Sequence, residues 1–450
     1  MRRNDIVRIT IDSLGSDAQG VGRYNGQVVF VPGALPGEDI DALIVKPMKG
    51  YAFGKLLKNH TTSPERVTPP CPAHGRCGGC SCQHMTYEAS LRFKQDQVQN
   101  CLSRIGGITL PVPLPVAMET PWRYRNKTTM PVTMRDGQPV AGFFARRSHR
   151  VVPVEDCLLS DEGSNQAVRT VLAWMQQYNV PAYDEDTHTG LVRHIMVRNN
   201  HINERMVVLI TAQQEVPKQA QLVDALRAQV PGLVSVCHSV QDNPDNVILG
   251  DTYRTLWGLP RLAQNICGIS CTLSPLSFFQ VNTPQAENLY RLALEMAAPT
   301  QQDLVADLYS GAGTITLLLA QHARHAVGIE ASPDATRDAL DNAMRNGIAN
   351  VRFINDLAER ALPQLVKEGF QPDIVVLDPP RKGADASVLH AIAQAAPRRI
   401  VYISCNPATQ ARDAKILTEL SYQATACQPV DLFCQTADVE NILLLEHGSE

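Results

Sequence analysis

The sequence predicts a multidomain protein with a small N-terminal β-barrel, an α+β central domain and a C-terminal α/β domain built on a doubly wound parallel sheet. Three observations support this prediction. The chain has 450 residues, which is too long for one ordinary domain. Short strand patterns punctuated by glycine fill residues 1–59. After about residue 271, strand patterns alternate with helix patterns. We therefore place the domains at 1–59, 60–270 and 271–450.

The N-terminal domain has the composition of a β-barrel. Ile6 to Ile11 and Gln27 to Val31 are rich in strand-forming residues, and glycines mark the turns around them. The stretch from Val29 to Glu38 resembles the TRAM module, an OB-type barrel of five strands found in RNA-modifying enzymes. OB-type barrels bind single strands through basic grooves and aromatic stacking. The alternative is a barrel that acts only as a spacer.

The charge balance does not itself indicate a nucleic-acid-binding protein, because the net charge is −4. Any RNA contact therefore has to come from local basic segments. Two basic segments stand beside aromatic residues, namely Lys46 to Lys58 with Tyr51 and Phe53, and Arg146 to Arg150 after Phe143 and Phe144. For each segment the alternative is a solvated charged face.

The sequence predicts a cytoplasmic protein. No stretch approaches ~18 consecutive apolar residues, so we expect no membrane partner. Charged residues interrupt the segment from Met1 to Asp12, which lacks the apolar run of a signal peptide. We also expect the protein to be monomeric.

The central region from about residue 73 to 270 mixes short strands and helices without a regular βα rhythm. This pattern predicts an α+β domain. Its clearest element is a helix near Tyr87 to Leu102, and Pro64 to Pro72 is expected to be a linker.

The C-terminal domain begins with a helix from Thr283, an N-cap residue followed by proline, to Ala297. Further elements are expected as strands at 304–309, 326–329, 373–377 and 400–404, and as helices at 314–322 and 408–420. Ligands bind at the carboxyl ends of the strands in such sheets. Three of those ends carry Tyr309 to Gly313, Glu330, and Asp378 to Arg381.

The glycine-rich turn and the acidic Glu330 suit either NAD or S-adenosylmethionine. Thr316 stands where a dinucleotide fingerprint has its third glycine, which disfavours NAD. At another strand end, Cys405 is followed by a helix whose N-terminal dipole favours a thiolate. A purely structural cysteine is the alternative there.

Four motifs together resemble the RNA uridine-5-methyltransferase family. They are Phe279 to Asn282, Asp378 to Gly383, Ser404 to Thr409 and Ala437 to Glu440. The resemblance covers nearly the whole chain and implies that the C-terminal domain is a Rossmann-like methyltransferase domain. The TRAM-like barrel and a cysteine cluster resemble the branch that modifies 23S ribosomal RNA. Transfer RNA is the alternative substrate.

The resemblance implies roles for residues at matching positions. Cys405 is expected to be the nucleophile and Glu440 the general base. The S-adenosylmethionine site is expected to be lined by Gln280, Tyr309, Glu330 and Asp378. The family usually carries histidine before Val-Glu, whereas this sequence has Asp438.

The cysteine cluster comprises four of the twelve cysteines, which stand within twelve residues at positions 71, 77, 80 and 82. All-cysteine ligation suits iron–sulfur clusters and zinc equally. The resemblance implies a 4Fe-4S cluster held by Cys71, Cys77, Cys80 and Cys157. Cys82 is excluded because only one residue separates it from Cys80.

Two other protein classes remain as alternatives. A non-catalytic RNA-binding protein with a degenerate methyltransferase fold would not need the reactive side chains that this chain keeps. An oxidoreductase that pairs NAD with an iron–sulfur cluster would leave the sequence around Cys405 without an explanation.

Overall fold

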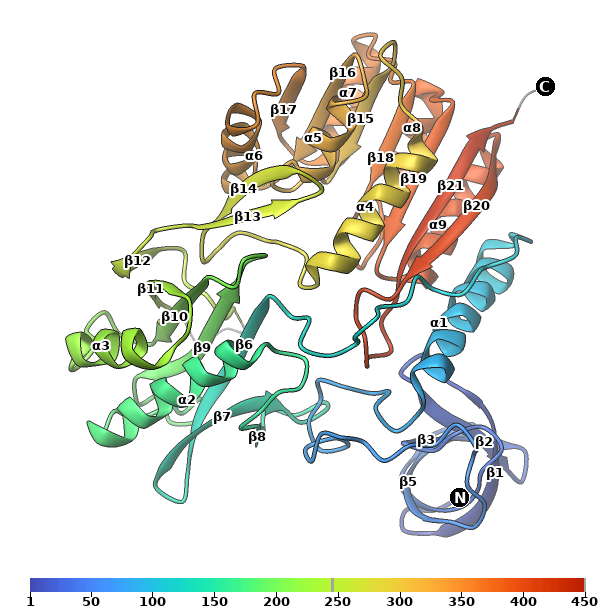
Figure 1. Ribbon diagram of the computed structural model, residues 1–450. Coiled ribbons are helices and arrows are strands. Elements are labelled where there is room, and N and C mark those ends of the chain that lie inside the picture. The colour runs from blue at the N-terminus through green and yellow to red at the C-terminus, as the bar shows by residue number, and fades with distance from the viewer. Residues whose placement is uncertain (244–246, 449–450) are drawn as a thin grey trace.

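The computed structural model describes residues 1–243 and 247–448. Residues 244–246 and 449–450, which fall within the predicted second and third domains, lie outside the described residues. The described part of the chain forms one closed barrel, two seven-stranded sheets and a two-stranded hairpin (Figure 1). None of the described helices is both long and apolar enough to cross a membrane.

The N-terminal barrel has five strands in the order β1-β2-β3-β5-β4. They are β1 (Ile6–Leu14), β2 (Gln19–Tyr24), β3 (Gln27–Pro32), β4 (Asp39–Pro47) and β5 (Tyr51–Asn59). Alternate residues of β1 are buried, which is the pattern of a strand with one face toward a core. The predicted barrel of residues 1–59 is therefore confirmed as a closed five-stranded barrel.

The central sheet has the order β12-β11-β10-β9-β6-β7-β8. Its strands are β6 (Lys127–Arg135), β7 (Gln138–Phe144), β8 (Val151–Pro153), β9 (Val192–Asn199), β10 (Arg205–Thr211), β11 (Leu233–Val240) and β12 (Tyr253–Gly258). Two helices, α2 (Glu162–Gln177) and α3 (Gln219–Gln229), accompany it. Trp174 and other apolar residues of α2 pack on the side chains of Ile195 and Val197 in β9. The result is an α+β arrangement.

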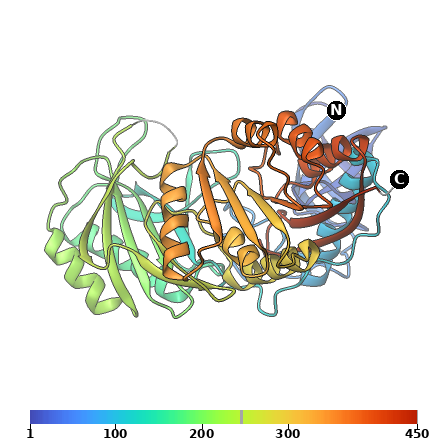
Figure 2. The same cartoon turned by 90° about the horizontal axis from the view of Figure 1, so that it is seen from above.

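The C-terminal sheet has the order β17-β16-β15-β18-β19-β21-β20. Its first five strands are parallel, namely β15 (Leu304–Leu308), β16 (His325–Glu330), β17 (Val351–Asn355), β18 (Ile374–Leu377) and β19 (Arg399–Ser404). Two antiparallel strands complete the sheet, β20 (Tyr422–Val430) and β21 (Glu440–His447). Helices lie on both of its faces (Figure 2).

One face is covered by α4 (Thr283–Ala297), α5 (Thr314–Ala320) and α6 (Pro333–Arg345). The other is covered by α7 (Ala358–Lys367), α8 (Ala386–Ala395) and α9 (Pro407–Glu419). The helix predicted from Thr283 to Ala297 has these bounds. Its N-cap is Asn282, whose side chain accepts from the Gln285 N–H, and not Thr283 as predicted.

Two elements assigned to residues 60–270 by sequence pack instead on the C-terminal sheet. Val98 of α1 (Tyr87–Cys101) and Leu102 of the adjoining π-helical turn η1 (Leu102–Gly106) share a core with α9. The hairpin of β13 (Leu262–Ile266) and β14 (Ile269–Leu273) shares a core with α4. Sequence periodicity identifies α1 as a helix but carries no information about which domain it packs against.

Candidate active site

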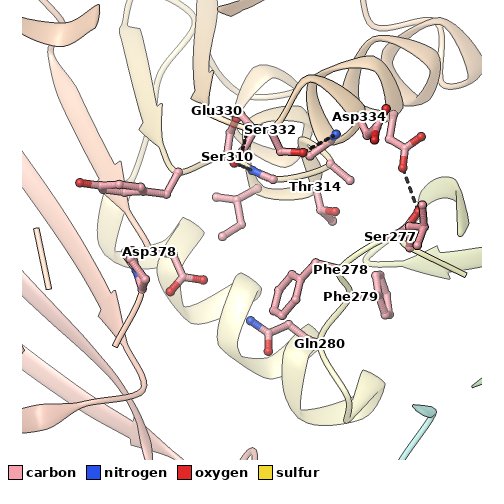
Figure 3. Close-up of a pocket in the computed structure, with 18 of the residues that line it drawn as sticks. Ser277, Phe278, Phe279, Gln280, Ser310, Thr314, Glu330, Ser332, Asp334 and Asp378 are labelled. Carbon is pink, nitrogen blue, oxygen red and sulfur yellow. Dashed lines mark hydrogen bonds between the residues drawn. The ribbon is translucent and has the colours of Figure 1, made fainter. Parts of the chain in front are cut away.

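A cavity of about 910 Å³ opens at the carboxyl ends of β15, β16, β18 and β19 (Figure 3). All six residues predicted for the cofactor site and the chemistry line it. They are Gln280, Tyr309, Glu330, Asp378, Cys405 and Glu440. The structure therefore brings together, in one cavity, residues that come from six separate segments of the chain.

Glu330 fixes the glycine-rich turn that follows β15. Its Oε2 accepts from the Gly311 N–H at 2.9 Å, and its Oε1 accepts from the Ser332 N–H at 2.7 Å. Gly313 has a φ of +79°, and a Cβ atom there would lie 2.8 Å from the Phe353 ring. Only glycine fits that position. The carboxylate of Glu330 keeps further lone pairs for ribose hydroxyls.

Two carboxyl groups that line the cavity, those of Asp378 and Asp307, have raised pKa values. Burial raises the pKa of Asp378 to about 7. Burial also raises the pKa of Asp307 to about 7, although Thr316 Oγ1 donates to its Oδ2 at 2.5 Å. Asp307 was not identified from the sequence, where it looks like an interruption in the strand before the glycine turn.

The nucleophile candidate and the base candidate stand at the ends of neighbouring strands. β19 and β21 are antiparallel, and Ser404 of β19 pairs with Asn441 of β21. Cys405 directly follows the end of β19 and Glu440 begins β21, so this register brings the two residues close together. Both line the cavity. Asn406 then caps α9 by accepting from the Ala408 N–H at 3.2 Å.

The thiol of Cys405 is protonated in the free protein at neutral pH. Burial raises its pKa to about 11, Glu440 and Asp378 add to the shift, and Arg381 opposes it. The dipole of α9 alone would lower this pKa. The surrounding carboxyl groups and the loss of water outweigh the effect of the dipole on this pKa.

Arg381 lies between Asp438 and Cys405. Its Nη2 donates to Asp438 Oδ1 at 2.9 Å, and its guanidinium also hydrogen-bonds to the Cys405 side chain. The sequence motif contains Arg381, but motif matching alone gave it no role. The family usually has histidine at the position of Asp438. In this chain the Asp438 carboxylate accepts the hydrogen bond from Arg381.

The loop that precedes Glu440 is held from the N-terminal half of the chain. Asp431 is buried and accepts from Lys94 and, at 2.6 Å, from the Tyr87 hydroxyl. The Ser81 and Cys82 N–H groups both donate to the Gln435 carbonyl, at 3.0 and 3.1 Å. The cysteine-rich segment and α1 thus hold the loop that leads to Glu440.

Phe278 and Ser277 also line the cavity, and the sequence analysis assigned them no role. Phe278 is 71% exposed and lies beside Gln280 (Figure 3). Ser277 Oγ donates to Asp338 on α6 at 2.9 Å. Their only signal in the sequence is their position immediately before the Phe279 to Asn282 motif.

The four cysteines predicted as metal ligands come together from two segments. Cys71, Cys77 and Cys80 pack against the hydrophobic core that contains Cys157. Burial raises the pKa of the Cys80 thiol to about 12, with Cys157 and Cys77 adding to the shift. Within residues 1–243 and 247–448, no group of three or more histidine, cysteine, aspartate and glutamate side chains has an arrangement that could hold a metal ion. The ligand set therefore stays a prediction.

The two basic segments meet on the surface of the barrel. Phe30, Tyr51 and Phe53 form an aromatic group there, with ring centroids 5.7 to 6.0 Å apart. The guanidinium carbon of Arg147, from the loop after β7, lies 5.3 Å from the centre of the Phe53 ring. Tertiary contact thus unites two segments that the sequence presents about a hundred residues apart.

The doubly wound sheet with its cavity at the strand ends defines a nucleotide-binding α/β enzyme. A family model described as tRNA (Uracil-5-)-methyltransferase matches residues 270–448, and a TRAM domain model matches residues 2–57. The chain is 42% identical to an uncharacterized RNA methyltransferase of Halalkalibacterium halodurans over 99% of this chain and 98% of the relative. It is 40% identical to an uncharacterized RNA methyltransferase of Clostridium tetani over 99% and 97%.

A solved structure has a similar fold over almost the whole chain. It is the Pyrococcus abyssi tRNA (uracil-54, C5)-methyltransferase in complex with S-adenosyl-L-homocysteine. The TM-score is 0.79 at 25% identity, and the match covers 98% of this chain and 100% of that one. The chain therefore belongs to the family of S-adenosylmethionine-dependent RNA (uracil-5-)-methyltransferases.

Proposed function

We propose that this protein methylates C5 of a specific uridine in 23S ribosomal RNA, with Cys405 as the nucleophile and Glu440 as the general base. The observation that carries the mechanism is that Cys405 and Glu440 line the same cavity, close enough for the charge of Glu440 to raise the pKa of Cys405. The reaction needs one group to form a bond to the base and a second group to remove a proton from it.

The proposed chemistry begins at C6 of the uracil. The sulfur of Cys405 bonds to C6, and the electron pair of the C5–C6 double bond moves into an enolate. Bound S-adenosylmethionine supplies the methyl group that C5 then takes. Glu440 removes the remaining hydrogen from C5, the double bond re-forms, and the cysteine leaves.

The cavity fits the cofactor in size and in donor set. Its volume of about 910 Å³ suits a molecule the size of a nucleotide. Glu330 stands at the end of the second strand of the domain, where ribose hydroxyls are held in such folds. We propose Gln280, Tyr309, Glu330 and Asp378 as the residues that hold it.

The electrostatics of the carboxyl groups suit proton removal. Burial and the neighbouring Asp378 raise the pKa of Glu440 well above its usual range. Once ionised, Glu440 is therefore a stronger base than an exposed carboxylate. The thiol of Cys405 must also lose its proton before attack. The negative charges of Glu440 and Asp378 raise the pKa of this thiol.

The barrel and the cysteine segment favour ribosomal RNA as the substrate, through their resemblance to that branch of the family. Transfer RNA is the second candidate, because the Pyrococcus abyssi structure of similar fold is that of a tRNA enzyme. We further propose that the protein acts in the cytoplasm as a monomer.

Cys71, Cys77, Cys80 and Cys157 are proposed to hold a 4Fe-4S cluster. Four soft thiolate donors suit such a cluster, and zinc equally. The methyl transfer takes no step through this group. Its proposed contribution is structural, because the segment that carries three of these cysteines continues into Ser81 and Cys82, which hold the loop before Glu440.

The substrate is tested by supplying the purified protein with labelled S-adenosylmethionine and unmodified transcripts of 23S ribosomal RNA and of transfer RNA. We expect 5-methyluridine in the ribosomal transcript. Mass mapping of both RNAs from a deletion strain identifies the position. Label in transfer RNA alone would select the second candidate, and label in neither RNA would contradict the proposed function.

A further inference from the structure

Two cationic side chains lie directly opposite each other on neighbouring strands of the central sheet. Lys127 of β6 pairs with Arg198 of β9 in the antiparallel register. Directly opposed residues of such a pair point to the same face, with Cβ atoms about 4.5 to 5.5 Å apart, and like charges there are destabilising. Burial lowers the pKa of Lys127 to about 8, and Arg198 adds to the shift.

Neither cation has a carboxylate partner. Arg198 is 2% exposed, and its Nη2 donates only to two carbonyl oxygens, those of Pro275 and Ser277. Its Nε is buried and has no hydrogen-bond partner. Among the described residues, no hydrogen bond or ion pair to the Lys127 ammonium is seen, and Lys127 remains partly exposed. Among residues 1–243 and 247–448, no carboxylate forms an ion pair with either cation.

The pair lies next to a segment that lines the active-site cavity. The carbonyl of Ser277 that Arg198 holds belongs to the segment that lines the cavity. Asn126, next to Lys127, donates from Nδ2 to the Gln280 carbonyl at 2.7 Å. The two cations lie on the face of the sheet away from α2, because Met196 shares their face whereas Ile195 and Val197 pack on α2.

We propose that Lys127 and Arg198 form a phosphate-binding site that holds the backbone of the substrate RNA beside the cavity. This inference rests on the proposed function and names how the substrate strand is held. One phosphodiester carries a single negative charge, which would reduce the net charge of the site from two positive charges to one. The cofactor carboxylate is a poorer match, because neither Lys127 nor Arg198 lines the cavity.

The partly exposed Lys127 makes the contact, and the buried Arg198 supports it electrostatically. Lys127 carries its charge below a pH of about 8 and loses it above. Its contribution to phosphate binding is therefore present at pH 7 and lost toward pH 9. The charged groups near it are Arg198 on β9 and Arg125 two residues before it, and the facing segment from Pro275 to Val281 carries no charge.

The test measures binding of the full-length protein to a radiolabelled, unmodified 23S ribosomal RNA transcript by filter retention, without S-adenosylmethionine. We expect Lys127→Gln to weaken binding at pH 7 roughly threefold to tenfold and to lower the salt slope by about 0.7 to 0.9, as for one lost phosphate contact. Affinity of the wild type should fall from pH 7 to 9. Lys127→Arg should bind RNA as well as the wild type at pH 7. Its affinity should decrease much less than that of the wild type between pH 7 and pH 9. The control is Lys367→Gln on α7, an exposed lysine.

Equal affinity and equal salt slope for Lys127→Gln and Lys367→Gln would overturn the inference. So would a selective loss of S-adenosylmethionine affinity in Lys127→Gln, measured by calorimetry, because the anion would then be the cofactor carboxylate. Methylation is followed separately. A wild-type protein that binds RNA with the expected slope but never methylates uridine would contradict the proposed function and leave the phosphate site standing.

Discussion

The Lys94 ammonium and the Asp431 carboxylate form an ion pair in which neither side chain retains any solvent exposure. Lys94 lies on α1 and Asp431 lies 337 residues later, in the loop that leads to Glu440. Lys94 Nζ also donates to the Phe433 carbonyl at 3.0 Å. A buried pair of this kind fixes geometry, because each charge becomes costly when the other is removed.

We expect Lys94→Met to destabilise the protein by about 3 to 5 kcal/mol, because it leaves the Asp431 carboxylate buried without its cation. The double variant Lys94→Met/Asp431→Leu should recover much of that loss, since both charges are gone. Urea unfolding measures both effects. Equal stability of the single variant and the wild type would mean that the pair does not hold the loop.

Two variants test the two proposed steps separately: bond formation by Cys405 and proton removal by Glu440. Cys405→Ala removes the atom that bonds to C6, so methylation should vanish and no covalent enzyme–RNA species should form. Glu440→Gln keeps the nucleophile but loses the base, so a methylated adduct should accumulate and migrate as a shifted band on a denaturing gel. If Glu440→Gln turns over freely, another group must remove the C5 proton. Asp438 is the nearest candidate in the sequence.

Arg381 is expected to control the ionisation of Cys405. The guanidinium opposes the rise in the pKa of Cys405, which burial brings to about 11. In Arg381→Gln this pKa should rise further, and Asp438→Asn should lower it by freeing Arg381 from its partner. The measurement is the pH dependence of Cys405 alkylation by iodoacetamide, quantified by mass spectrometry of the peptide. Arg360→Gln on α7 is the matched control and should leave the profile unchanged.

Asp307 makes stability depend on pH. Burial raises its pKa to about 7, so its folded state binds a proton that the unfolded chain releases near pH 4. The stability that comes from this proton is complete below pH 4 and is lost as pH rises through 7. Asp307→Asn should therefore stabilise the protein at pH 8.5, on the order of 2 to 4 kcal/mol, and have little effect at pH 4. Thermal unfolding at both values checks this; equal shifts at the two values would contradict it.

The cysteine segment yields a prediction about metal content. Protein purified without oxygen should be brown and contain about four irons per chain. Serine at Cys71, Cys77, Cys80 or Cys157 should abolish the colour. Cys82→Ser should keep it, because Cys82 is buried and its Sγ donates to the Thr436 carbonyl at 3.3 Å. Stoichiometric zinc without iron would show that these cysteines bind zinc and not a 4Fe-4S cluster.

The sequence predicts what local pattern and motif spacing encode. The structure has the expected helix from Thr283 to Ala297 and the expected strand end at Glu330. Both limits could be predicted because helix and strand ends depend mainly on residues close in the sequence. All six candidate site residues meet in one cavity. Tyr309, Glu330, Asp378 and Cys405 meet there because parallel strands align their carboxyl ends at one edge. Gln280 and Glu440 reach it from the segment before α4 and from the start of the antiparallel β21.

The remaining features depend on contacts between distant segments. The order of the central sheet, the packing of α1 on the C-terminal domain and the contact of Arg147 with Phe53 join segments that no periodicity links. The rise in the pKa of Cys405 is of the same kind, because burial and Glu440 cause it, whereas the helix dipole is visible from sequence alone.

The position of β21 has a consequence for the newly made chain. This strand lies between β19 and β20 although it follows both in the sequence. During translation, Cys405 leaves the ribosome before Glu440, and a chain with the nucleophile but no base could bond to a uridine without releasing it. Until β21 inserts, however, the sheet beside Cys405 is incomplete and the cavity lacks a wall. The proposed nucleophile and the proposed base therefore come together only after β21 has inserted between β19 and β20.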